Sequence, residues 1–240
     1  MRMHTTAGGV AIALVALGMA LAGCGSDSKT AASSSSAASS SSSASSSASS
    51  SSAAPSSTSS SPAAGANPTI ADYIQENGIT ETPVKRGDPG APAIDLPTPE
   101  GWADAGAKTP QGAYDAIVFT DPSMAADPPS IVAIVSKLTG NVEATKIFQY
   151  APGELKNLPG YESAGDGNNA KLGGFDAYQS GATYVKDGAK RLIAKKTVAI
   201  PASDGSGIYV LQLSANGTED QIAPLMDATS QIDEKTTITP

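Results

Sequence analysis

The sequence predicts an α+β domain, an antiparallel β-sheet with helices packed on it. Segments with helical and strand-like periodicity follow one another in the order helix, strands, helix, three meandering strands, helix. They do not alternate as the βαβ units of a parallel sheet would. In addition, an Asp187-Gly188 pair stands between two long strand-like runs, which is a strong hairpin signal. We therefore expect neighbouring strands to pair antiparallel.

The first half of the domain begins near Asn67 and is expected to open with a helix. Apolar residues recur there at helical spacing, and Asn77-Gly78 is a plausible stop. Strand-like runs follow at 79–85, 94–96, 116–119 and 130–138. Gly140-Asn141 is then expected to cap a second helix that carries Ile147, and Pro152 to interrupt it.

The second half is expected to be a three-stranded meander closed by a helix. Its strands are the runs 175–185, 190–200 and 208–213. Lys196 falls on the apolar side of the middle strand, so we expect its amine to extend toward solvent or to lie at an edge. Pro224 predicts that the closing helix begins late or kinks. That helix carries Ile222, Leu225, Met226 and Ile232, with Thr218 and Gln221 as a capping box.

Residues 1–23 are typical of a lipoprotein signal peptide. Arg2 precedes an apolar run that is too short to span a bilayer, and Leu21, Ala22, Gly23 and Cys24 follow as a lipobox. Cleavage before Cys24 would let its sulfur carry a diacylglyceryl group, and two acyl chains anchor a protein stably. The alternative is an ordinary secretory signal with an incidental cysteine.

Residues 24–66 comprise the lipidated Cys24 and a Ser/Ala-rich stalk. The stalk shows no apolar periodicity, so nothing offsets the entropy of ordering it. A flexible coil of about 40 residues has ends roughly 35 Å apart. We expect it to hold the single domain of residues 67–240 off the outer face of the cytoplasmic membrane, in the cell envelope. Shedding of some of the protein stays open.

Composition argues against several functional classes. The formal net charge is −8, which disfavours nucleic acid as a partner. The single histidine, His4, lies in the signal peptide, and the single cysteine is Cys24. The mature domain therefore has no imidazole or thiol for His- or Cys-based catalysis, and we expect no enzyme, no metal and no cofactor.

Three stretches resemble functional motifs, but we expect none of them to carry a function. Residues 101–109 resemble a P-loop, but the spacing to the lysine is wrong. Residues 165–170 mimic a dinucleotide fingerprint, yet a strand-like segment follows where a helix is required, so we expect a surface turn. Asn216-Gly217-Thr218 is likewise expected to be a turn.

Aromatic side chains are the remaining binding candidates. Trp102, Phe148, Tyr150 and Tyr178 are the weak candidates for lining a ligand site, although aromatic residues more often belong to the core. A sheet half-covered by helices can leave a groove at its open edge, which is a common place for a ligand. The sequence does not show whether the protein's own side chains fill it.

Several short runs resemble the LpqN/LpqT family of mycobacterial lipoproteins. The runs are Phe148–Tyr150, Pro152–Leu155, Leu158–Tyr161, Leu172–Ala177, Lys196–Pro201 and Tyr209–Leu213, and the likeness extends over residues 68–239. The resemblance implies a Mog1/PsbP-like α/β/α sandwich and a role in envelope lipid traffic or protein contacts. It supplies no catalytic motif.

Three functions remain open. The first is a non-enzymatic, membrane-anchored module that binds envelope glycolipids or the membrane proteins that transport them. The second is a protein-interaction adaptor or secreted effector with no small-molecule ligand. The third is a hydrolase built on carboxylates or on serine with lysine. An apolar groove with polar groups at one end would favour the first, and an exposed apolar patch without concavity the second.

Overall fold

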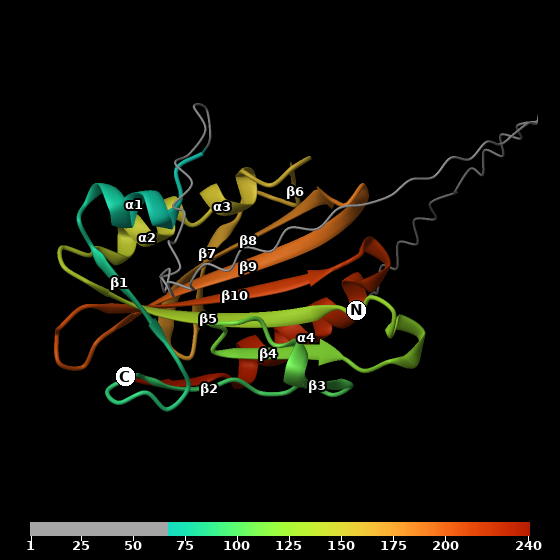
Figure 1. The fold of residues 1–240 in the computed structure, drawn as a ribbon, viewed down its shortest axis with the longest axis horizontal. Coiled ribbons are helices and arrows are strands. Elements are labelled where there is room, and N and C mark those ends of the chain that lie inside the picture. Colours follow the sequence, from blue (N-terminus) through green and yellow to red (C-terminus); the bar gives the residue numbers. More distant parts are fainter. Residues whose placement is uncertain (1–66) are drawn as a thin grey trace, which may run out of the picture. The chain divides into compact units, whose positions relative to one another are not determined.

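A nine-stranded antiparallel sheet organises residues 67–240, the part of the chain described by the structure, a computed structural model (Figure 1). Its strands are β1 (Thr80–Val84), β3 (Trp102–Asp104), β4 (Asp115–Phe119), β5 (Ser130–Thr139), β6 (Glu162–Ser163), β7 (Asn168–Leu172), β8 (Phe175–Lys186), β9 (Ala189–Pro201) and β10 (Ile208–Gly217). The main path runs β3-β4-β5-β10-β9-β8-β6, with β1 paired to β5 and β7 to β8. The predicted signal peptide, Cys24 and the stalk lie outside the described residues.

A separate two-stranded sheet joins the end of the chain to an early segment. β2 (Ala93–Asp95) and β11 (Thr237–Thr239) pair antiparallel, so that Ile238 lies opposite Ile94. Both isoleucines are buried in the main core. The C-terminal strand therefore closes the core beside the segment that follows β1.

The helices lie in two layers on opposite faces of the sheet (Figure 1). Helices α1 (Ile70–Glu76), α2 (Ala144–Tyr150) and α3 (Gly153–Lys156) form one layer, and α4 (Ile222–Lys235) forms the other. Val210 belongs to the core cluster under α1 and α2, whereas Leu211 belongs to the cluster under α4. Successive strand residues point to opposite faces, so this alternation confirms the predicted sheet flanked by helices.

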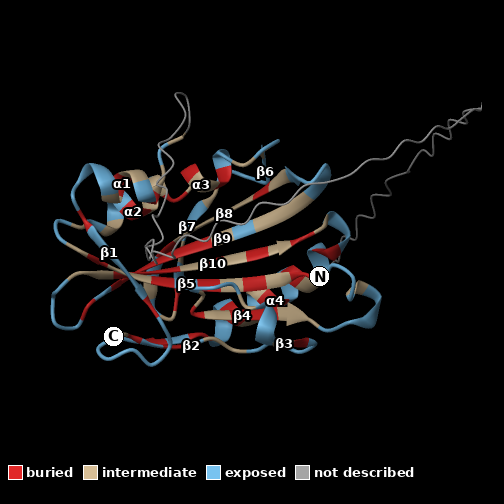
Figure 2. Ribbon diagram, viewed as in Figure 1, coloured by how far each residue is buried: buried red, intermediate tan, exposed pale blue. Residues whose placement is uncertain are grey.

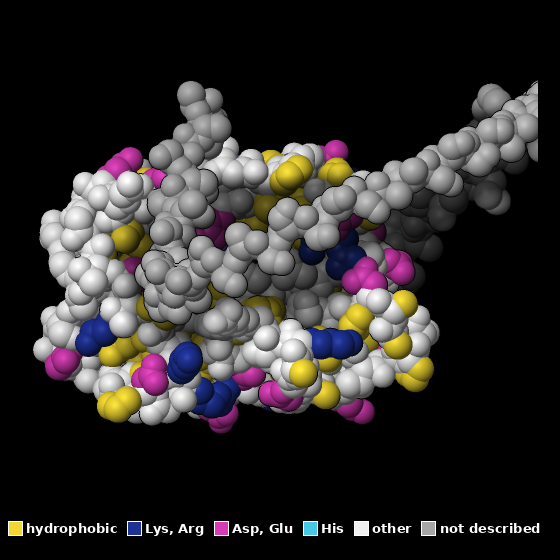
Figure 3. All heavy atoms as spheres, viewed as in Figure 1, with side chains coloured by type: hydrophobic (Ala, Val, Ile, Leu, Met, Phe, Trp, Pro, Cys, Tyr) yellow, Lys and Arg dark blue, Asp and Glu magenta, His cyan; other side chains and the backbone are white. Residues whose placement is uncertain are grey.

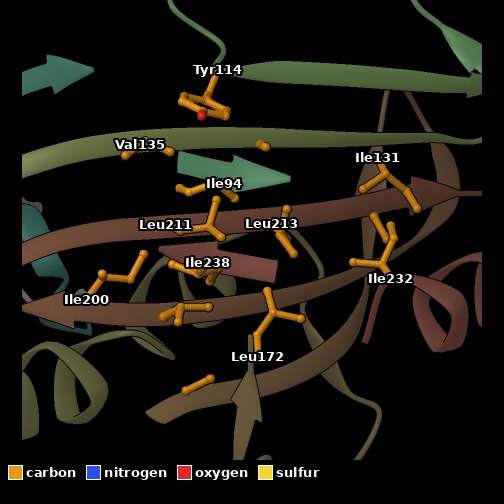
Figure 4. Close-up of a cluster of buried hydrophobic side chains, with 14 of the residues drawn as sticks. Ile94, Tyr114, Ile131, Val135, Leu172, Ile200, Leu211, Leu213, Ile232 and Ile238 are labelled. Atoms are coloured by element: carbon orange, nitrogen blue, oxygen red, sulfur yellow. The ribbon is translucent and has the colours of Figure 1, made fainter. Parts of the chain in front are cut away.

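The central strands β5, β10 and β9 are buried along much of their length (Figure 2). Five consecutive residues of β9, from Lys196 to Ile200, are buried, because helices cover both faces of the sheet there. The larger cluster lies on the α4 side and includes Val135, Leu211 and Ile200 (Figure 4). This continuous core fixes the strand surface on which α4 rests.

The β8–β9 hairpin is confirmed by its turn. Asp187 and Gly188 both have positive φ, 53° and 78°. A two-residue turn with both central residues in this region matches the twist of the strands, and Asp-Gly suits it because these residues tolerate left-handed backbone. Lys186 and Ala189 are the last paired residues before it.

Two expected boundaries were wrong. Helix α2 begins at Ala144 after the N-cap residue Glu143, so Gly140-Asn141 does not cap it. The backbone N–H of Glu143 instead donates to the Tyr73 hydroxyl at 3.0 Å, a tertiary contact that sequence spacing does not reveal. Strand β10 also continues to Gly217, because Asn216 and Gly217 pair with β9 where a turn was expected.

Two of the four apolar residues named for the closing helix are exposed, not buried. Leu225 and Ile232 are buried, but Ile222 is 48% exposed and Met226 is 63% exposed. The Thr218–Gln221 capping box is present, and it leads through a 3₁₀ turn (Glu219–Gln221) into α4. The helix therefore begins late, and Pro224 lies in its first turn, where a missing N–H breaks no helical hydrogen bond. Other 3₁₀ turns occupy Gly106–Lys108 and Pro122–Met124.

Candidate ligand-binding groove

A groove of about 730 Å³ lies between α4 and the sheet. This volume is within the roughly 300–1,000 Å³ typical of sites for small molecules. Strands β5, β10, β9 and β8 form its floor, and α4 forms one wall through Met226, Thr229, Ser230, Ile232 and Asp233. The loop between β6 and β7, residues 164–167, closes the opposite side together with Asn168. The groove exists because α4 covers only part of this face.

The chemical character of the floor changes from strand to strand. At β5 and β10 the lining is apolar, with Ile131, Leu213 and Ala215. Ile131 and Leu213 lie near Ile232 of α4 at one side of the core cluster (Figure 4). At β9 and β8 the lining includes the polar side chains of Lys196 and Gln179, next to the small residues Ala194 and Gly181. Since the strands are ordered β5-β10-β9-β8, the groove has an apolar side and a polar side.

An ion pair lies where the two sides meet. Lys196 points from β9 toward α4, where its Nζ pairs with Oδ1 of Asp233. Lys196 is only 9% exposed, whereas the Asp233 side chain is 41% exposed. The expectation that Lys196 would extend to solvent or lie at an edge was wrong, because β9 is internal and α4 supplies the partner carboxylate. Next to this pair, Gln179 Nε2 donates to Asn168 Oδ1 at 3.2 Å.

The loop between β6 and β7 was not predicted to take part in a ligand site. Residues 165–170 were expected to form a surface turn, but only 165–167 lie in the loop, and β7 begins at Asn168. Gly165, Asp166, Gly167 and Asn168 line the groove. Gly167 has φ 67°, and a Cβ there would lie 2.3 Å from the Tyr178 hydroxyl oxygen. The positive φ favours glycine here, and a Cβ would also require the Tyr178 hydroxyl to move. The two glycines of this segment were therefore the sequence signal for a tight loop.

The predicted aromatic candidates lie elsewhere. Tyr178 lines a second hollow, of about 260 Å³, on the α3 side of the sheet, and its hydroxyl donates to the Asp166 carbonyl at 3.4 Å. Trp102 is buried against Phe119, with ring centroids 5.5 Å apart. Tyr150 stacks near Tyr73 in the α1–α2 layer, and Phe148 packs against the same cluster. The structure therefore does not bring these four residues together.

Three further properties of the described residues concern metal ligands, membrane-spanning helices and surface charge. Within residues 67–240 no group of three or more acidic, histidine or cysteine side chains is placed to hold a metal ion. None of the helices between Asn67 and Pro240 is long and apolar enough to cross a membrane. On the face drawn in Figure 3, Lys and Arg side chains lie among Asp and Glu side chains.

Comparison with known proteins places the chain in a family. The family model described as "Probable lipoprotein LpqN" matches residues 66–239. Lipoprotein LpqN of Mycobacterium tuberculosis is 54% identical over 237 residues, which are 99% of each chain. The chain belongs to the LpqN lipoprotein family. Its resemblance to that family, noted from short runs of sequence, is confirmed.

Solved structures include one of an LpqN family member. The crystal structure of LpqN involved in cell envelope biogenesis of M. tuberculosis matches with a TM-score of 0.68 at 52% identity, over 73% of this chain and 100% of that one. The Ran-binding protein Mog1p of Saccharomyces cerevisiae matches with a TM-score of 0.37 at 13% identity, over 66% of this chain and 95% of that one. The LpqN match covers a length of chain similar to that of the domain containing the groove.

Proposed function

We propose that this LpqN-family protein is a membrane-anchored, non-enzymatic module of the cell envelope that binds an amphipathic glycolipid in the groove under α4. One observation carries the proposal: the lining changes from apolar at Ile131 and Leu213 to polar at Lys196 and Gln179. A lipid with an acyl chain and a sugar head has the same division. The M. tuberculosis relative, which is involved in cell envelope biogenesis, supports the cellular setting.

The anchor and stalk fit this role as predicted from sequence. A lipid on Cys24 would hold the protein at the outer face of the cytoplasmic membrane, and residues 24–66 would let the domain reach lipids or lipid-transport proteins nearby. Handing over a ligand needs a groove but no catalyst. The ion pairing of the groove lysine with Asp233 supports a binding role over a serine–lysine hydrolase.

The test is photo-crosslinking of the full chain in its own membrane. The probe is dodecyl maltoside with a diazirine in the alkyl chain, and the labelled peptides are mapped by mass spectrometry. We expect labelling of peptides that contain residues 226–233 or 213–215. Ala194 is exposed and lines the groove, so Ala194→Trp should fill the space and abolish this labelling.

Ala223→Trp is the matched control, because Ala223 is exposed on α4 outside the groove lining. It should label like the native protein. Native protein that is labelled only outside the groove, or Ala194→Trp that labels normally, would overturn the proposal.

A protein-adaptor function has one observation in its favour. Ile222 and Met226 stand one helical turn apart on α4, and both are exposed. They form a small apolar edge beside the groove, since Met226 also lines it. If a transport protein docks there, Ile222→Ser should weaken its co-purification while groove labelling persists, because Ile222 lies outside the groove lining.

A further inference from the structure

The groove contains a buried amine whose hydrogen-bonding capacity is only partly used. Lys196 is 9% exposed and lines the floor. An ammonium has three N–H donors, and among residues 67–240 the Lys196 Nζ donates only to Asp233. Buried polar groups are almost always paired with protein or water. The remaining donors are available to water or to an acceptor oxygen of a ligand in the groove.

The neighbouring lysine shows that this arrangement is particular to position 196. Lys195 points to the other face of the sheet, where it pairs with Glu154 of α3. Its ammonium is therefore directed away from the groove, although the residue contributes to the lining. Lys196 is consequently the cation that a ligand in the groove meets.

The groove lining also contains two acidic residues, whose negative charge counteracts the attraction of Lys196 for an anion. Asp233 is already paired with Lys196, and Asp166 lies on the loop side. A phosphate head bound at the Lys196 ammonium would also meet the Asp233 carboxylate, and like charges at short range disfavour it. A sugar hydroxyl or an ester carbonyl carries no charge. A hydroxyl can donate to Asp233 and accept from Lys196, so both partners are satisfied.

We propose that the Lys196–Asp233 pair is the specificity element of the groove and selects an uncharged, oxygen-rich head over an anionic one. This inference rests on the proposed function, because it assigns a role within the same groove. Lys196 supplies the donor, and Asp233 both holds the lysine in place and repels anions. The pair then discriminates between ligands by their charge, in addition to linking α4 to β9.

The test compares two diazirine probes that share one dodecyl chain, a maltoside and a phosphate. The full chain is labelled in its membrane, and the concentration for half-maximal labelling of the groove peptides is measured for each. The native protein should prefer the maltoside. Asp233→Asn removes the repulsion and frees the lysine, so the preference should shift toward the phosphate by about tenfold, the effect of one charge-assisted hydrogen bond.

Two further variants separate this role from a structural one. Asp227→Asn makes the same charge change at an exposed position of α4 outside the lining, and should leave the preference unchanged. Lys196→Met with Asp233→Asn removes both charges while keeping bulk, and should weaken maltoside labelling without a gain for phosphate. Thermal unfolding of each variant shows that it is folded.

The outcomes distinguish this inference from the function on which it rests. If Ala194→Trp abolishes groove labelling but Asp233→Asn leaves the preference unchanged, the groove binds lipid and the pair does not select the head. A native protein that labels equally well or better with the phosphate probe overturns the inference too. If neither probe labels the groove of the native protein, the proposed function itself fails.

Discussion

Lys195 and Lys196 are consecutive residues of β9, yet their ammonium groups form ion pairs on opposite faces of the sheet. Lys195 pairs with Glu154 of α3, and Lys196 pairs with Asp233 of α4. Successive side chains of a strand point to opposite faces, so one dipeptide links both helical layers to the same strand. The Lys196–Asp233 pair lies at the groove under α4, whereas the Lys195–Glu154 pair lies on the opposite face of the sheet.

The Lys195–Glu154 pair should stabilise the attachment of α3. The side chains are 13% and 33% exposed, and Gln212 Nε2 also donates to Glu154, at 3.5 Å. Lys195→Met should lower the free energy of unfolding by about 1–3 kcal/mol, because it leaves a partly buried carboxylate without its cation. Urea unfolding measures this. Adding Glu154→Gln should recover part of the loss, and a neutral single variant would contradict the prediction.

Gly153 should tolerate no side chain. It is buried at the start of α3, and a Cβ there would lie 1.9 Å from the Pro68 carbonyl oxygen. Gly153→Ala must displace backbone and should cost about 2 kcal/mol or more in unfolding free energy. Gly181→Ala is the control, because its Cβ would meet nothing closer than 3.6 Å. Equal melting temperatures for the two variants would show the prediction to be wrong.

The β8–β9 turn should be sensitive to branching at Gly188. Its φ of 78° lies in the left-handed region that β-branched residues rarely adopt. Gly188→Val should therefore destabilise the protein by about 1–2 kcal/mol. Gly188→Asn should cost less, because asparagine visits this region more readily. Thermal unfolding of the two variants gives the comparison, and the reverse ranking would contradict it.

Acid should weaken the edge formed by β6. Lys190 hydrogen-bonds to Glu162 at 2.9 Å and attracts its charge, and the Thr183 hydroxyl adds a third contribution, so the pKa of Glu162 lies below its ordinary 4.5. A lowered pKa means that the contact favours the folded state above about pH 4.5. The contribution is lost as pH falls through the lowered pKa of the folded state.

NMR titration of the Glu162 carboxyl tests this directly. Lys190→Met should move the pKa of Glu162 back toward 4.5, because the variant removes both the hydrogen bond from Lys190 and the attraction of its positive charge. An unchanged pKa in that variant would mean that another group holds the carboxylate.

Cys24 should carry the membrane anchor predicted by its lipobox. Cys24→Ala should leave the precursor uncleaved by the lipoprotein peptidase, and the protein should lose its lipid. Metabolic labelling with an alkyne fatty acid and membrane fractionation measure both. Acyl labelling that persists in the variant would rule out this cysteine as the anchor.

Local patterns were enough to predict most elements. The spacing of Ile70 and Tyr73 predicted α1, and Asp187-Gly188 predicted the hairpin, because periodicity and turn chemistry act between near neighbours. Short strands such as β3 and β7 were missed, since they bury little surface of their own and depend on long partners for pairing. The family resemblance likewise came from sequence and was confirmed.

The sequence by itself determined the fold class, the hairpin and the absence of histidine and cysteine from the domain. It also placed Lys196 on the apolar side of its strand. Only the tertiary structure decided what meets that lysine, because Asp233 is 37 residues away and reaches it only when α4 docks. The same docking leaves Met226 exposed and the floor at Ala194 open. Periodicity fixes which residues share a face, but long-range packing fixes how much of that face is covered, and the groove is the uncovered part.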